Sequence, residues 1–274
     1  MQVLLQVKDL KVSYRGVGSS QSHAVEDVSF EIAEGEVLGL MGESGCGKTS
    51  IALALLGLLS QDQAQISGSI QFRGEELLSK DRSSLRAIRG AGISLVFQEP
   101  ELALSPVMKI RDQVSEVIHA HNNWKWQLCR AEAELTLARV GLANSPRIFS
   151  SYPHQLSGGQ RQRVIFAQAL ACKPALLIAD EPAASLDARS QSELLALLRK
   201  LQRKMNISIL LISHAPEVQA SLADRLMVMA NGRIVEQGSF EQLYRNPSHL
   251  CTRAMLRTST PSSAAEEPNL EMVR

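Results

Sequence analysis

The chain has 274 residues, 45% of them hydrophobic, and its 29 basic and 28 acidic residues give a formal net charge of +1, which disfavours a nucleic-acid binder that relies on a broad positive field. No apolar run approaches the roughly 18–20 residues needed to cross a bilayer, and no basic N-terminal segment precedes an apolar one, so neither a membrane span nor secretion is expected. The four cysteines lie far apart and form no CxxC pair, which argues against a disulfide framework or a structural zinc site.

The N-terminal residues are predicted to form two antiparallel strands. Apolar and polar residues alternate over 10–14 and again over 28–32, on either side of a Gly/Ser-rich turn at 16–20. Residues 37–41 then form a continuous apolar run, which is typical of a strand covered on both faces.

A buried parallel sheet is predicted next. A helical pattern covers 48–59, further apolar strand candidates lie at 93–97, 176–179 and 207–212, and helical patterns separate the later ones. Alternation of helices with fully apolar strands is typical of a parallel sheet with helices on both faces. The predicted fold class is therefore α/β, with an N-terminal antiparallel β subdomain.

One segment interrupts this alternation. Residues from about 99 to 154 contain helical runs at 110–120 and 126–140 and no convincing strand, and we interpret them as an inserted helical subdomain. The last residues, 258–274, are rich in Ser, Thr, Ala, Glu and Pro and are expected to be a disordered tail. Residues 1–257 are therefore expected to form one domain.

A phosphate-binding loop is predicted between the strand at 37–41 and the helix that follows it. Its residues fit the pattern G-x-x-x-x-G-K-[ST] at every defined position: Gly42, Glu43, Ser44, Gly45, Cys46, Gly47, Lys48 and Thr49. Glycines let successive backbone N–H groups point at phosphate oxygens, and the helix N-terminus adds a partial positive charge. Lys48 is expected to contact the β and γ phosphates, and the Thr49 hydroxyl to bind Mg²⁺. Cys46 stands at an undefined position of the pattern, where it is either a small filler or a redox switch.

Two acidic residues end a later apolar strand. Asp180 follows the run at 176–179, and an Asp at the carboxyl end of a parallel strand beside a phosphate loop is placed to hold the metal ion. The adjacent Glu181 can polarise an attacking water.

A second anion site is predicted where another helix begins. The segment 156–160 reads Leu-Ser-Gly-Gly-Gln, and a Ser hydroxyl with exposed backbone N–H groups at a helix N-terminus can bind an anion. Two phosphate-binding helix starts in one chain need an explanation beyond a single nucleotide site.

These segments together resemble the ATP-binding cassette family of transport ATPases, over nearly all of residues 1–257. The resemblance rests on the phosphate loop with the following Ser50, on the signature residues Leu156, Ser157, Gly158, Gly159 and Gln160, and on the strand that ends in Asp180 and Glu181. Four further motifs match in order, namely Tyr14 for adenine stacking, Gln98 for the glutamine loop, 185–187 for the D-loop and His214 for the switch histidine.

The resemblance implies that the chain binds ATP and Mg²⁺. It implies that Glu181, His214 and Gln98 act in catalysis, and that Thr49, Gln98 and Asp180 hold the metal. Two cassettes are expected to pack head to tail, with each ATP between one phosphate loop and the other signature. Closure on ATP would then drive a membrane permease that docks on the helical insertion. Tyr14, on its alternating strand, also fits an ordinary half-buried core residue.

A narrower resemblance points to the peptide and nickel uptake ATPases. It rests on residues 97–108, on Tyr-Pro-His at 152–154, and on 246–254, although Ser105 stands where that branch usually has Asn. The implied protein is a peripheral subunit on the cytoplasmic face of the inner membrane. Its implied partners are integral-membrane permease subunits, a second ATPase subunit and, indirectly, an external substrate-binding protein, with no nucleic acid.

Two other classes of protein stay open. A stand-alone ATPase of the same fold in DNA repair or translation would carry a zinc module, a coiled coil or a second cassette, and the sequence contains only one phosphate loop. A regulatory module that binds ATP without hydrolysing it is disfavoured by the presence of Glu181 and His214.

Overall fold

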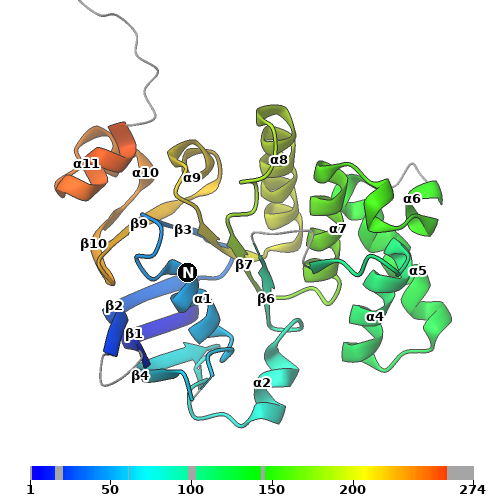
Figure 1. The fold of residues 1–274 in the computed structure, drawn as a ribbon, viewed down its shortest axis with the longest axis horizontal. Coiled ribbons are helices and arrows are strands. Elements are labelled where there is room, and N and C mark those ends of the chain that lie inside the picture. Colours follow the sequence, from blue (N-terminus) through cyan, green and yellow to red (C-terminus); the bar gives the residue numbers. More distant parts are fainter. Residues whose placement is uncertain (1, 16–20, 61, 98–102, 143–145, 258–274) are drawn as a thin grey trace, which may run out of the picture.

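The computed structural model describes residues 2–15, 21–60, 62–97, 103–142 and 146–257 (Figure 1). Its N-terminal part is an antiparallel sheet in the order β2-β1-β4-β5. These strands are β1 (Val3–Arg15), β2 (Gln21–Ala33), β4 (Ala64–Phe72) and β5 (Glu75–Glu76). Leu10 of β1 lies opposite Val28 of β2, which confirms the predicted antiparallel pairing of the two segments. The predicted turn at 16–20 and the predicted tail at 258–274 lie outside the described residues.

A second sheet, in the order β10-β9-β3-β8-β7-β6, forms the centre of the molecule. Its strands are β3 (Val37–Gly42), β6 (Ile93–Val96), β7 (Leu176–Asp180), β8 (Ser208–Ile212), β9 (Arg225–Ala230) and β10 (Arg233–Gly238). All neighbours pair in parallel except β10, which is antiparallel to β9. The apolar runs predicted as buried strands all belong to this sheet, and β3, β7 and β8 lie side by side so that their carboxyl ends meet at one edge.

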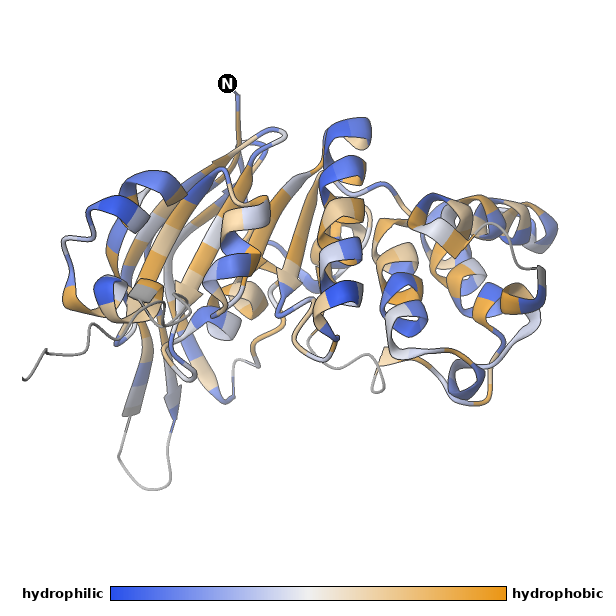
Figure 2. Ribbon diagram, turned by 90° about the horizontal axis from the view of Figure 1, so that it is seen from above, coloured by the Kyte–Doolittle hydropathy of each residue, from blue (hydrophilic) through white to orange (hydrophobic). Residues whose placement is uncertain are grey.

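Both faces of the central sheet are covered, and the side chains of β7 show how. Leu176 and Ile178 pack into a core that includes α1 (Lys48–Leu55) and the antiparallel sheet. Leu177 and Ala179 pack on the opposite face, in a core with α7 (Gly158–Leu170) and α8 (Ala188–Met205). Figure 2 shows the apolar residues concentrated along these strands. The predicted helices therefore lie on both faces, but on one face α1 shares the cover with the antiparallel sheet.

The helices of the predicted insertion lie together at one side of the sheet (Figure 1). They are α4 (Ile110–Asn122), α5 (Trp126–Leu137), the π-helical turn η1 (Ala138–Leu142), α6 (Pro146–Ser150) and the 3₁₀ turn η2 (Pro153–Gln155). The helical run predicted at 126–140 breaks at its end, because the backbone of Gly141 takes a φ of 81°. Buried apolar residues of α4 and α5 pack with α7 in one core, which ties the insertion to the sheet.

Four further helices complete the described part of the chain. They are α2 (Arg82–Ile88), α9 (Pro216–Leu222), α10 (Phe240–Arg245) and α11 (Leu250–Arg257). Leu243 of α10 and Leu256 of α11 pack against Leu226 and Val228 of β9. Within the described ranges, no helix is both long enough and apolar enough to cross a membrane.

Candidate nucleotide-binding site

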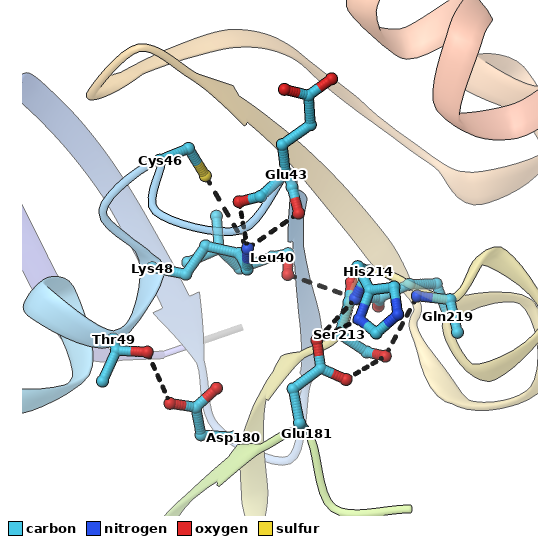
Figure 3. A network of polar contacts seen from close by, with 12 residues as sticks. Leu40, Glu43, Cys46, Lys48, Thr49, Asp180, Glu181, Ser213, His214 and Gln219 are labelled. Carbon is cyan, nitrogen blue, oxygen red and sulfur yellow. Dashed lines mark hydrogen bonds and ion pairs between the residues drawn. The ribbon is translucent and has the colours of Figure 1, made fainter. Parts of the chain in front are cut away.

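The phosphate loop curls around the ammonium group of Lys48 (Figure 3). Lys48 begins α1 and is buried, and its Nζ donates hydrogen bonds to the carbonyl oxygens of Gly42 and Glu43 at 2.8 and 2.7 Å. Those carbonyls belong to the end of β3 and the first turn of the loop. The side chain thus holds the loop closed and places a positive charge inside it.

The start of α1 leaves its backbone N–H groups available to an anion. Gly47 precedes the helix with a φ of 112°, and a Cβ at this position would lie 2.1 Å from the Ala24 carbonyl oxygen, so only glycine fits. No side chain of the described residues caps the helix, and no acidic residue stands in its first turn. Unpaired N–H groups and the helix dipole together suit a phosphate group.

Two oxygen-bearing side chains meet beside the loop. The Thr49 hydroxyl donates to Oδ2 of Asp180 at 2.9 Å, and Asp180 is buried at the end of β7. Burial raises the pKa of Asp180 above its ordinary value, and the Thr49 hydrogen bond opposes that rise. A hydroxyl and a carboxylate form a hard oxygen donor set of the kind that Mg²⁺ binds next to phosphates, so the residues fit this ion.

Glu181 is held from three sides. Its carboxylate accepts hydrogen bonds from the Ser213 hydroxyl at 3.0 Å and from the His214 backbone N–H at 2.9 Å, and its Oε1 lies 2.6 Å from His214 Nδ1. The backbone of Glu181 takes a φ of 48°, which is uncommon outside glycine, and its N–H donates to Ile212 at the end of β8. The Glu181 side chain is 11% exposed and the His214 side chain 63%, so the histidine faces outward over the carboxylate.

Tyr14 also lies beside the loop, at the end of β1. It is half-buried, and its hydroxyl is 3.0 Å from the Ser50 hydroxyl on α1. The structure thus brings one predicted adenine-binding residue to the first turn of the phosphate-binding helix. Gln98, predicted for catalysis and the metal, lies outside the described residues just after β6.

The signature segment forms a separate group at the start of α7. The Ser157 hydroxyl accepts from the Gln160 backbone N–H at 3.3 Å, and the Gln160 side-chain oxygen accepts from the Ser157 N–H at 3.0 Å, which is a capping box. Ser157, Gly159 and Gln160 line a cavity of about 360 Å³ that Arg163 also borders. α7 packs in a core on one face of the central sheet, and α1, which begins at the phosphate loop, packs in another core on the opposite face. The two predicted anion sites of the chain are therefore distinct.

Sequence reasoning missed several residues that hold the segments around Glu181 and His214 in place. Ser213 contacts Glu181 directly, and its only signal was a hydroxyl next to His214. Gln162 on α7 is buried and donates to the Pro182 carbonyl oxygen at 2.7 Å, so the helix that begins at the signature is bonded to the loop after Glu181. Asp187 of the predicted D-loop caps α8 by accepting from the Ser190 N–H.

The environment of Cys46 bears on the two interpretations of that residue. Its thiol is buried, forms no disulfide among the described residues and lies 3.8 Å from Lys48 Nζ; burial raises the pKa of Cys46 above its ordinary value, although the Lys48 charge opposes that rise. A raised pKa lowers the thiolate fraction, which is the reactive form. The structure therefore favours a small filler in the loop.

Comparison with known proteins gives a consistent result. Residues 25–184 match the profile of the ABC transporter family. The chain is 40% identical over 270 residues to the oligopeptide transport ATP-binding protein OppD of Lactococcus lactis subsp. cremoris, covering 98% of this chain and 79% of the relative. It is 38% identical over 257 residues to the dipeptide transport ATP-binding protein DppD of Bacillus subtilis, covering 93% and 76%.

Solved structures agree with this assignment. A dimeric, post-hydrolysis ATP-binding cassette, MJ0796 bound to ADP and Pi, superposes with a TM-score of 0.75 at 26% identity, covering 86% of this chain and 98% of that one. The family profile spans more than half of the chain, and the relatives match nearly all of it. The chain belongs to the ABC transporter family, as an ATP-hydrolysing subunit.

Proposed function

We propose that this subunit binds and hydrolyses ATP to drive a peptide importer, and that each of its ATP sites is shared with a second ATPase subunit. The observation that carries the proposal is the meeting of Thr49, Asp180, Glu181 and His214 where β3, β7 and β8 end beside the phosphate loop. Peptides are the proposed cargo because OppD and DppD are named for oligopeptide and dipeptide transport. Nickel, the other expected cargo, has no support in these names.

The phosphate loop and the residues around it have proposed roles in binding ATP and Mg²⁺. Lys48 and the backbone N–H groups from Gly42 to Ser50 would hold the phosphates, and Tyr14 would stack on the adenine. Thr49 and Asp180, with Gln98, would hold Mg²⁺, which would neutralise part of the negative charge of the phosphates.

Glu181 is proposed as the general base. Its carboxylate can accept a proton from a water only if it is held in position, and the Ser213 hydroxyl and the His214 backbone N–H hold it there. His214 would orient Glu181 through Nδ1 and present the rest of its ring to the nucleotide side. Removing either group should therefore slow hydrolysis more than binding.

The second half of the site is proposed to come from another cassette. Ser157, Gly158, Gly159 and Gln160 lie apart from the loop of their own chain, so they would bind the nucleotide held by a partner ATPase subunit. Permease subunits would dock on the helical subdomain at about 99–154 of the 1–257 domain. This arrangement would place the subunit at the cytoplasmic face of the membrane.

Copurification tests the proposal. The tagged full-length chain, extracted in detergent from its own organism, is expected to retain a multispanning membrane protein and to hydrolyse ATP with Mg²⁺ present. Recovery with a nucleic acid, or with no membrane protein while ATP is still hydrolysed, would favour a non-transport ATPase of the same fold.

A further inference from the structure

Gln219 is a buried polar residue that the proposed catalytic set does not include. It lies on α9 between the buried Val218 and Leu222, and it is fully buried. Its Nε2 lies 3.1, 3.3 and 3.4 Å from the carbonyl oxygens of Ser213, Leu211 and Leu40 (Figure 3). Because carbonyl oxygens only accept, the amide nitrogen must face them, and its two N–H groups are shared among three acceptors.

These carbonyl oxygens belong to the segments that carry the proposed chemistry. Leu40 stands two positions before Gly42, where β3 enters the phosphate loop, and Leu211 stands near the end of β8. Ser213 follows β8, and its N–H also donates to the Leu40 carbonyl oxygen at 3.2 Å. The amide of Gln219 therefore joins the strand under the phosphate loop to the loop that carries His214.

The surroundings leave space for this amide and for little else. A Cβ on Gly39 of β3 would lie 2.2 Å from the Gln219 Oε1, so a side chain there would displace the amide. That Oε1 is buried and has no hydrogen-bond partner among the described residues, which is unfavourable. An apolar side chain at this position would leave no unpaired oxygen. We therefore attribute the presence of glutamine here to the hydrogen bonds that its Nε2 donates.

We propose that Gln219 is a positioning residue for ATP hydrolysis. By fixing the Ser213 carbonyl against the end of β3, it keeps the Ser213 hydroxyl and the His214 N–H aimed at the Glu181 carboxylate. It contacts Glu181 only through these two residues, so its loss should misplace the general base while the phosphate loop stays intact. The inference rests on the roles proposed above for Glu181 and His214.

The test compares two buried glutamines in the full-length chain, assayed as the complex that copurifies with it. Gln219→Met keeps the length of the side chain and removes its donors. Gln202→Met is the matched control, because Gln202 on α8 is also buried and donates to the Gly35 carbonyl oxygen, and its Oε1 also has no partner in the part of the chain that the structure describes. It lies outside the segments around Glu181 and His214. The temperature of thermal unfolding is expected to fall for both variants, because each loses a buried hydrogen bond.

Kinetics separate the two variants. We expect Gln219→Met to lower kcat about 10- to 100-fold, since small misplacements of a catalytic group have effects of this size, and to leave ATP affinity and KM within about twofold of wild type. Gln202→Met should keep the wild-type kcat. An unchanged kcat in Gln219→Met, or an equal loss in Gln202→Met, overturns the proposal.

Two additions make every outcome decisive. If Gln219→Met does not fold, Gln219→Leu takes its place, because its smaller apolar side chain also has no donor; a wild-type kcat there refutes the inference, and a reduced kcat with unchanged ATP affinity supports it. Glu181→Gln is measured in parallel. If Glu181→Gln abolishes turnover while Gln219→Met does not alter kcat, only this inference fails. If Glu181→Gln keeps turnover, the proposed catalytic site fails first.

Discussion

Replacing Glu181 by Gln tests the proposed general base with little structural disturbance. The amide has nearly the same shape, its oxygen can still accept from the His214 N–H, and the Ser213 hydroxyl can rotate to accept from the new NH₂ group. Gln also tolerates the backbone φ of 48° about as well as Glu does. The Thr49–Asp180 pair is not part of these contacts, so the proposed metal site should survive.

The expected loss of rate is large. Removing a general base typically costs about 10²–10⁴ in rate, which is about 2.7–5.4 kcal/mol in activation free energy. Ser213→Ala is the variant for comparison, because it removes one of the three hydrogen-bond donors around the Glu181 carboxylate and keeps the carboxylate itself. One hydrogen bond to a charged group contributes about 1.5–3 kcal/mol, so that variant should lose about 10- to 160-fold. The middle of the range for Glu181→Gln, about 10³, exceeds this loss, so we expect Glu181→Gln to be the slower of the two.

Phosphate release at saturating ATP and Mg²⁺ measures the rate, and size-exclusion chromatography with ATP measures dimerisation. With the correct partner cassette present, we expect Glu181→Gln to bind ATP, to dimerise more readily because one negative charge is lost at the interface, and to hydrolyse ATP slower by orders of magnitude. If it hydrolyses ATP within about fivefold of wild type, Glu181 is not the base.

Three further substitutions test other parts of the site. Lys48→Ala removes the buried cation that bonds Gly42 and Glu43, and calorimetry should detect no ATP binding; unchanged affinity would refute the phosphate-loop assignment. Tyr14→Ala should weaken ATP binding by about 1–3 kcal/mol in the same measurement with little change in saturated turnover, whereas equal affinity would make Tyr14 a core residue. Ser157→Arg should leave ATP binding by the isolated subunit unchanged but block hydrolysis in the assembled transporter. Thermal unfolding controls for the loss of the helix cap, and a turnover equal to wild type would contradict the shared site.

The parts of the fold that sequence could predict are those with local signals. β3, β7 and β8 are continuous apolar runs because both of their faces are buried, and the phosphate loop has a fixed spacing. β4 (Ala64–Phe72) was missed although its apolar residues alternate with polar ones, because Gly68 interrupts the alternation at its centre. Its place in the sheet depends on its pairing with β1, as between Leu5 and Phe72, and a local sequence pattern does not show which distant strand is the partner.

The same distinction applies to the candidate site. These residues could be proposed from motifs, since Lys48 and Thr49 stand at fixed positions of the phosphate-loop pattern and Asp180 and Glu181 stand at the end of an apolar strand. The contacts that hold them could not, because a glutamine within an otherwise apolar helix face, such as Gln219, is indistinguishable in sequence from a solvated one. Its burial depends on how α9 packs against β3 and β8.

The double cover of the central sheet has a consequence for how freely the sequence can vary. Every residue of β7 and β8 is buried, so neither strand offers a face on which a polar substitution would be neutral. β10, at the edge, has residues that are only partly buried or exposed. In a scan of all single substitutions, tolerance should therefore be lowest at the centre of the sheet and should rise toward β10, following strand order rather than distance from the nucleotide.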